Sequence, residues 1–289
     1  MPRNGYRRDL GQRGFIHQDK PLVMSGASWL EPMGSVTLWE DFLMDVLADS
    51  PFVTAASTGT ALTAVAIDNT AGAPVAGHGG WIIGKTDDVA AEITEINFGG
   101  LGTGAGLPPF VPSRAGNGVM VYEVGTVMPV ALTARQYYAG WTDAAIEGTG
   151  VGTLPLGINT GGVYTIADTA TDAAGWVFSS FATAPTIWKY AATLNGAQST
   201  ASASTEGVTS VVDCYTVSRV EIDALGNAYF YQTISASSAL GRVQPTSMTG
   251  SLALAVTPTI PLLGYFGAHA TTTTGVELEM DYCFLSSAR

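Results

Sequence analysis

Residues 211–232 read VVDCYTVSRVEIDALGNAYFYQ, and this stretch decides the fold class. Two runs rich in β-branched and aromatic residues, 214–222 and 227–232, flank a segment in which Gly226 and Asn227 can adopt the positive φ of a tight reversal. The first run presents two alternating faces, one with Tyr215, Val217, Arg219, Glu221 and Asp223, the other with Cys214, Thr216, Ser218, Val220 and Ile222. This period of two is typical of a β-strand rather than of a helix, so the stretch predicts a β-hairpin.

The end of the chain repeats the alternation. Glu277, Glu279 and Asp281 alternate with apolar residues that include Met280 and Tyr282, which predicts a strand with a wet face and a dry face. Regularly spaced β-prone runs of this kind are typical of a large β-sandwich. The other predicted strands are residues 62–67, 80–84, 91–98, 119–124, 136–141, 163–166, 176–181, 186–192, 252–256 and 263–267.

Composition supports the same class. The chain has 289 residues, of which 46% are hydrophobic and only 12% charged, and its 35 glycines suit short strands joined by many turns. We therefore predict an all-β protein with one sandwich domain at residues 35–289, preceded by an extended arm at residues 1–34. Residues 35–49 fit both helical and strand spacing, and are expected to run from a strand into a short helical turn.

Charge is unevenly placed along the chain. Residues 1–20 hold five basic and two acidic residues, a net charge of +3, whereas the other 269 residues hold seven basic and 22 acidic residues, a net charge of −15. A basic arm of this kind docks on an acidic surface, on nucleic acid or on a neighbouring subunit, or remains a solvated tail. The acidic body disfavours nucleic acid. No export signal and no membrane-spanning run is apparent, so a cytoplasmic protein is expected.

The two cysteines, Cys214 and Cys283, match no metal-binding spacing. Both fall in strand runs beside apolar positions, which favours buried free thiols; a disulfide between them is the alternative.

The order of several short motifs resembles the concanavalin-like, or laminin-G-like, jelly-roll modules of structural proteins in tailed bacteriophages. The resemblance covers residues 36–285 and implies a two-sheet jelly roll. For phage proteins it also implies a place in the virion, as capsid decoration, head fibre or tail-associated protein. The motifs are WEDFL (39–43), VYEV (121–124), YAGWTD (138–143), WKY (188–190), RVEID (219–223), GNAYFY (226–231), LGYF (263–266) and LEMDY (278–282).

The same fold houses glycoside hydrolases, in which two carboxyl groups face each other across the sugar. Laminarinase-like enzymes carry Glu-x-Asp-x-x-Glu on one strand. Here Gly226 stands where the second acid would follow Glu221 and Asp223, and Phe284 stands there after Glu279 and Asp281. We therefore expect no enzyme. The acids of the last strand are instead expected to form a solvated or inter-subunit face.

Other sites have weaker support. The three histidines, His17, His78 and His269, lie far apart, so no metal and no cofactor is expected. The glycine-rich residues 100–106 lack the Lys-Ser/Thr of a phosphate loop. Some aromatic residues can stack on sugars but are more often packed in a sandwich core. These are Tyr137, Tyr138, Trp141, Trp188 and Tyr190.

These observations predict a non-enzymatic virion protein, a capsid decoration or cement protein on the capsid surface, assembled in the host cytoplasm. Its expected partners are the major capsid protein and further copies of itself, as a dimer or trimer; neither nucleic acid nor a membrane is expected. The alternative is a carbohydrate-binding module of a head fibre or tail, with polysaccharide as partner. The arm residues expected to bind a partner are Arg3, Tyr6, Arg7, Arg8, Arg13, Phe15 and Trp29.

Overall fold

The computed structural model describes the strands of the sandwich and several of their turns. The described residues are 36–40, 53–57, 82–85, 92–98, 110–115, 118–128, 135–144, 154–158, 166–168, 170–180, 187–198, 208–209, 214–235, 245, 247–270 and 277–287. The arm at residues 1–34 and the predicted strand at 62–67 lie outside these ranges. None of the helices in the described part of the chain has the length and apolar character needed to cross a membrane.

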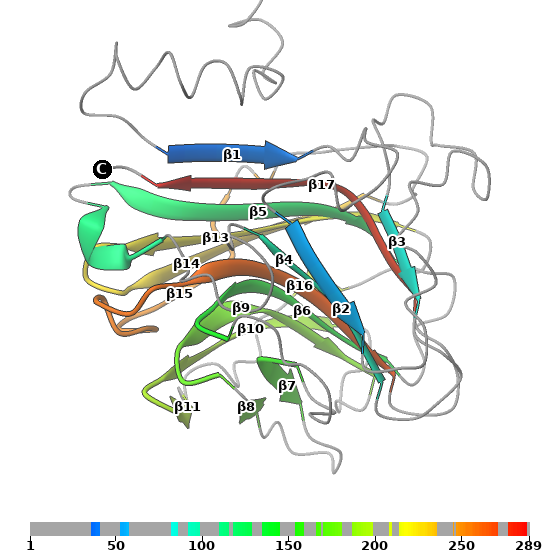
Figure 1. Ribbon diagram of the computed structural model, residues 1–289, viewed down its shortest axis with the longest axis horizontal. Coiled ribbons are helices and arrows are strands. Elements are labelled where there is room, and N and C mark those ends of the chain that lie inside the picture. Colours follow the sequence, from blue (N-terminus) through cyan, green and yellow to red (C-terminus); the bar gives the residue numbers. More distant parts are fainter. Residues whose placement is uncertain are drawn as a thin grey trace, which may run out of the picture.

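Two antiparallel sheets face each other (Figure 1). The first, called the hairpin sheet, has the order β1 (Val36–Glu40), β17 (Glu277–Ser287), β5 (Val119–Val127), β13 (Tyr215–Asp223), β14 (Ala228–Ile234) and β15 (Gly250–Leu252), with β3 (Ile82–Lys85) also paired to β17. The second sheet has the order β11 (Ala197–Gln198), β10 (Ile187–Leu194), β9 (Ala173–Ser179), β6 (Arg135–Thr142), β16 (Leu263–Ala270), β4 (Glu92–Phe98) and β2 (Val53–Ser57), with β12 (Val208–Thr209) paired to β10.

Two small elements lie outside the two large sheets. A short pair, β7 (Leu156–Ile158) and β8 (Ile166–Asp168), lies against the outer side of the second sheet (Figure 1). A 3-10 helix, η3 (Pro112–Arg114), precedes β5. The chain passes repeatedly from one sheet to the other, as in a concanavalin-like jelly roll, which confirms the all-β two-sheet fold expected from the sequence.

The hairpin is confirmed as β13 and β14. The face that begins with Cys214 points into the sandwich, where its five side chains are at most 2% exposed. Gly226 makes the reversal at φ +81°, and a Cβ there would approach the carbonyl oxygen of Val256 to 2.2 Å. Only glycine suits this position, because both the backbone conformation and the close contact exclude a side chain.

Aromatic residues fill the space between the sheets. Trp176 meets Tyr190 and Phe230 edge-on, with ring centroids 5.9 and 6.0 Å apart. The five aromatics that sequence reasoning weighed as sugar-stacking residues are at most 4% exposed. The packing interpretation of Tyr137, Tyr138, Trp141, Trp188 and Tyr190 is therefore confirmed. Both cysteines are buried free thiols, as favoured from the sequence.

The faces predicted for the last strand are wrong at its centre. The register of β17 against β5 shifts between Met280 and Tyr282, so an extra residue at the bulge reverses the alternation. Tyr282 consequently packs with Tyr215 on the outer side of the hairpin sheet rather than inside the sandwich. Asp281, expected on a solvated or inter-subunit face, lies on the outer side with Tyr215 but is only 6% exposed.

Two further elements differ from the prediction. The predicted strand at 252–256 ends at Leu252, because the chain turns at Leu254 with φ +49°. β7 is not among the predicted strands, since a three-residue strand carries too short a pattern to detect. Of the strand predicted at 163–166, only Ile166 lies within the described residues, where it begins β8.

Candidate functional site

One rung of side chains crosses the outer face of the hairpin sheet. Arg219 lies opposite Tyr231 on one side and opposite Glu123 on the other, and Glu123 lies opposite Phe284. Residues directly opposite each other in a sheet project to the same side. The four strands β14, β13, β5 and β17 therefore contribute one continuous row of aromatic and charged groups.

Arg219 is the centre of this row. It forms ion pairs with Glu221 and, at 3.7 Å, with Glu123. Its guanidinium lies 5.7 Å from the ring centroid of Tyr231, whose hydroxyl donates to Glu221 at 3.4 Å. The Arg219 side chain is 32% exposed, against 13% for Glu221 and 4% for Glu123. One guanidinium thus serves two carboxylates, which leaves negative charge in excess; burial and then Glu221 raise the pKa of Tyr231.

Two tyrosine–carboxylate pairs continue the face toward the far end of the sheet. Tyr282 donates to Glu123 at 2.6 Å, and Tyr215 donates to Asp281 at 2.5 Å. The Tyr215 hydroxyl and the Tyr282 ring lie over Gly125, where a Cβ would approach Tyr215 Oη and Tyr282 Cε1 to 2.3 Å. The absence of a side chain at Gly125 lets the two rings occupy the outer surface of the sheet.

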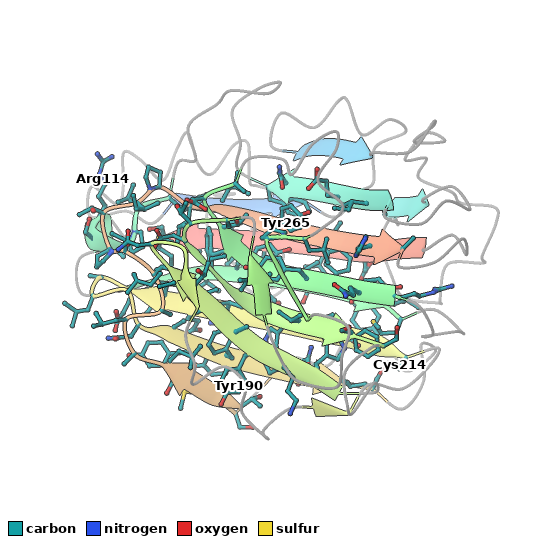
Figure 2. The ribbon with its side chains drawn as sticks, turned by 90° about the horizontal axis from the view of Figure 1, so that it is seen from below. Arg114, Tyr190, Cys214 and Tyr265 are labelled. Atoms are coloured by element: carbon teal, nitrogen blue, oxygen red, sulfur yellow. The ribbon has the colours of Figure 1, made fainter. Side chains whose placement is uncertain are left out.

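Two turns meet at the end of the sandwich that we call the hairpin end. The amides of Ala255 and Val256 both donate to the carbonyl of Gly226, and the amide of Leu254 donates to Asn227 Oδ1. The side chains of Leu225 and Leu254 are 67% and 59% exposed. Figure 2 marks the hairpin end by Arg114 and the opposite end by Cys214.

Asp223 holds the hairpin turn together. Its carboxylate accepts hydrogen bonds from the amides of Leu225 and Asn227, from the Asn227 side chain and from the Tyr229 hydroxyl, at 2.8–3.0 Å. Burial opposes ionisation, but these hydrogen bonds outweigh it, and the pKa of Asp223 is lowered. The hydrogen bond to Asp223 raises the pKa of Tyr229.

Replacement of Asp223 by alanine is expected to lower the free energy of unfolding by about 1–3 kcal/mol, because four donors lose a charged acceptor. A lowered pKa stabilises the fold above the unfolded value near 3.9, and this stabilisation is lost as pH falls through the folded value. The difference between wild type and Asp223→Asn should therefore shrink below about pH 4. Chemical denaturation at several pH values measures this difference in the free energy of unfolding. Spectrophotometric titration should show a lower pKa for Tyr229 in Asp223→Asn than in the wild type. An unchanged Tyr229 titration would contradict the assigned contact.

The outer face of the second sheet carries polar side chains, but these are buried. Leu154 and Leu156 pack onto Tyr138 and Tyr265 there, and Tyr265 donates to Glu95 at 2.5 Å. Other polar side chains on this face are at most 8% exposed. They are Asn97, Gln136, Lys189 and His269.

Two of these groups are unsatisfied. The Asn97 amide and both nitrogens of His269 make no hydrogen bond among the described residues. Burial lowers the pKa of His269 to about 4 and also lowers the pKa of Lys189. This face offers no exposed aromatic platform within the described ranges.

Sequence reasoning placed the binding residues in the arm. Those residues, Arg3, Tyr6, Arg7, Arg8, Arg13, Phe15 and Trp29, lie outside the described ranges, so their role stays a prediction. The row around Arg219 was missed as a site. Its signal was present in the alternation of 219–223 and 229–231, but combining them requires the hairpin register, and Glu123 is 96 positions from Arg219 in the chain. No group of three or more His, Cys, Asp or Glu side chains in the described segments is arranged to hold a metal ion.

Comparisons with known proteins give only distant similarity. No family model matches the chain, and no curated sequence matches it. Among solved structures, a protein of unknown function from Shewanella oneidensis MR-1 is 12% identical with a TM-score of 0.45, over 88% of this chain and 87% of that one.

Two further structures are similar to the same degree. A glycoside hydrolase family 16 endo-glucanase from Bacteroides ovatus is 10% identical with a TM-score of 0.44, over 86% and 99% of the two chains. The exoplasmic/lumenal domain of VIP36 in its metal-free form is 12% identical with a TM-score of 0.44, over 88% and 92%. At these values the similarities support no inference about a shared activity.

Proposed function

We propose that the chain is a non-catalytic virion structural protein of a bacteriophage, a capsid decoration or cement protein that binds the outside of the capsid. In this proposal its partner is the major capsid protein, it is assembled in the host cytoplasm, and its place is the capsid surface. The observation that carries the proposal is the hairpin end, where Leu225 and Leu254 are exposed on turns fixed to each other by hydrogen bonds. Pre-positioned apolar side chains of this kind suit a protein partner.

The backbone conformation of Leu254 supports the same proposal. Leu254 holds φ at +49°, a conformation that is unfavourable for a residue other than glycine. Asn227 supports this conformation by accepting the Leu254 amide at 3.0 Å. A strained backbone that displays an exposed leucine points to a contact outside the chain.

The carboxylates support a non-catalytic role. Glu95, Glu123 and Asp281 each accept a hydrogen bond from a tyrosine hydroxyl, and each is at most 6% exposed. A retaining glycosidase instead needs two carboxyl groups about 5–5.5 Å apart, facing each other across a sugar. These three carboxylates act as internal acceptors that connect neighbouring strands.

Aspartate at both Leu225 and Leu254 is expected to weaken binding to purified capsids by at least about tenfold, because two apolar anchors would carry charge into the contact. Cosedimentation with capsids that lack the protein measures this, and loss of the protein should lower the heat resistance of the particles. Met248→Asp is the matched control, since Met248 is also an exposed apolar side chain, at 51%. Undiminished binding of the double variant with a native melting profile would refute the proposal.

A carbohydrate-binding module of a head fibre or tail is the second candidate. The observation that favours it is the pair Tyr229 and Tyr231, half-buried on the outer face of β14 beside Arg219 and Glu221. Rings with adjacent charged groups suit stacking on a sugar with hydrogen bonds to its hydroxyls. A glycan array, probed with and without calcium, tests it: binding that Tyr231→Ala abolishes would favour this candidate, and silence would count against it.

A further inference from the structure

The arm is attached at the hairpin end of the sandwich. β1 forms one edge of the hairpin sheet, and its first residue, Val36, lies opposite Ser287 of β17 (Figure 1). Ser287 lies opposite Met120, and Met120 lies opposite Ile222, the last inward-facing residue before the hairpin turn. The strand that follows the arm therefore begins in the same rung as Ile222, three strands away from it and next to the rung that carries Glu221.

The outer face of the hairpin sheet and the arm have opposite charges. Among the described side chains, this face carries four carboxylates and one guanidinium, a formal charge of −3. The first 20 residues carry a net charge of +3. The charged groups of the face are Glu123, Glu221, Asp223, Asp281 and Arg219, and those of the arm are Arg3, Arg7, Arg8, Arg13, Lys20, Asp9 and Asp19.

The face is also built to receive arginine. It already holds one guanidinium over the Tyr231 ring, at 5.7 Å from the centroid, with carboxylates on both sides. Arginine favours this combination of an aromatic face and planar carboxylates. Tyr229 and Phe284, both half-buried, extend the aromatic surface on two sides of that position.

Length does not limit where the arm binds. A segment of 34 residues spans up to about 110 Å when extended, whereas the strands from β1 to β14 cover about 19 Å. The Arg219 side chain is 32% exposed, so the centre of the row is accessible to a partner. An arm that leaves from the edge of the sheet can exchange with that of a neighbour about a twofold axis, which closes the assembly.

We propose that residues 1–34 of one copy bind the outer face of the hairpin sheet of a second copy, with arm arginines on the excess carboxylates around Arg219 and Tyr231. The proposal rests on the partner-binding role that the sequence predicts for the arm, and names its acceptor surface. The resulting unit is a dimer joined by exchanged arms. Salt is expected to weaken this dimer, because dissolved ions screen the attraction between exposed charges. The Debye length of that screening is about 10 Å at 0.1 M ionic strength.

The experiment uses the full chain and measures self-association by analytical ultracentrifugation over a range of concentration and salt. The arm variant replaces Arg3, Arg7, Arg8 and Arg13 by glutamine, and the face variant is Glu221→Lys. Each is expected to weaken dimer formation by about tenfold or more. Thr259→Lys, at an exposed position in the turn before β16, is the control for added positive charge and should dimerise like wild type.

Complementation identifies the occupant. A heterodimer of the arm variant, whose face is intact, and the face variant, whose arm is intact, keeps one of the two arm–face contacts. The mixture should therefore associate more strongly than either variant alone. A second face variant, Tyr231→Ala, guards against a local folding defect in Glu221→Lys, and thermal melting checks both.

Three outcomes would overturn the proposal: a full chain that is monomeric at low salt, a dimer whose stability the face variants leave unchanged, and a mixture that associates no more strongly than either variant alone. Capsid binding is read separately through Leu225 and Leu254, so a failure of the decoration role does not appear as a failure of arm exchange, and the reverse also holds.

Discussion

Replacement of Trp176 by alanine is expected to lower the free energy of unfolding by about 3–5 kcal/mol, a large part of the 5–15 kcal/mol typical of a folded domain. Trp176 is fully buried and belongs to the second sheet, yet it meets Phe230 of the hairpin sheet edge-on. Its Nε1 donates to the carbonyl oxygen of Arg219 at 3.3 Å. The substitution therefore opens a cavity between the sheets and removes the indole N–H that donates to that carbonyl.

The same contact links the core to the candidate binding face. The Arg219 backbone is held from inside by Trp176, while the Arg219 side chain is held outside by Glu123, Glu221 and Tyr231. Loss of Trp176 should therefore also loosen the position of the guanidinium. In this fold a hydrogen bond from the opposite sheet reaches the backbone of the residue at the centre of the outer row.

Chemical denaturation followed by tryptophan fluorescence and circular dichroism measures the effect. Trp176→Phe is the matched variant: it keeps most of the aromatic packing and loses only the N–H donor, so its loss should be nearer about 1–2 kcal/mol. Leu225→Ala, at an exposed position, should change stability by less than about 0.5 kcal/mol. A loss below about 1 kcal/mol for Trp176→Ala would show that the assigned packing is wrong.

The hairpin could be predicted because its evidence is local. Alternation along β13 and the reversal at Gly226 are properties of neighbouring residues, and steric rules act on them directly. Burial of the aromatics followed from the sandwich itself, since a two-layer core of this size must be filled by large side chains.

The features that were missed depend on contacts between distant residues. The bulge near Asp281 inverts the faces of β17, and nothing in the alternation of 276–285 announces it. The pairs Tyr282–Glu123 and Tyr215–Asp281 join residues 159 and 66 positions apart. The turn at Leu254 was misread as strand because a leucine at positive φ contradicts its own propensity, and tertiary hydrogen bonds to Gly226 and Asn227 hold it there.

Acidification from about pH 6.5 to pH 4 is expected to remove about 3 kcal/mol of stability through one residue, His269. It is 8% exposed on the outer face of the second sheet, and burial lowers its pKa from 6.5 to about 4. Above pH 6.5 the imidazole is neutral in both the folded and the unfolded chain, so the fold keeps its full stability. Between pH 6.5 and 4 the unfolded chain takes up the proton and the folded chain does not, so stability falls by about 1.4 kcal/mol per pH unit.

The surroundings of His269 explain why no other group compensates. Its neighbours across the sheet are Gln136 of β6 and Ile93 of β4, neither of which is ionisable. Neither ring nitrogen has a hydrogen-bond partner among the described residues. A charged imidazole would therefore be desolvated without an acceptor to receive its protons, which is why the neutral form persists in the folded chain.

His269→Gln should isolate this effect, because glutamine stays neutral over the whole range. The stability of wild type relative to this variant is expected to fall between pH 6.5 and 4 and to level off below pH 4, where both states of the wild type are protonated. Asp223, whose pKa is lowered by its hydrogen bonds, is present in both proteins, so its contribution cancels in the difference. Denaturant titrations at half-unit pH intervals measure that difference, and a flat difference would mean that solvent or an acceptor reaches His269 in the folded protein.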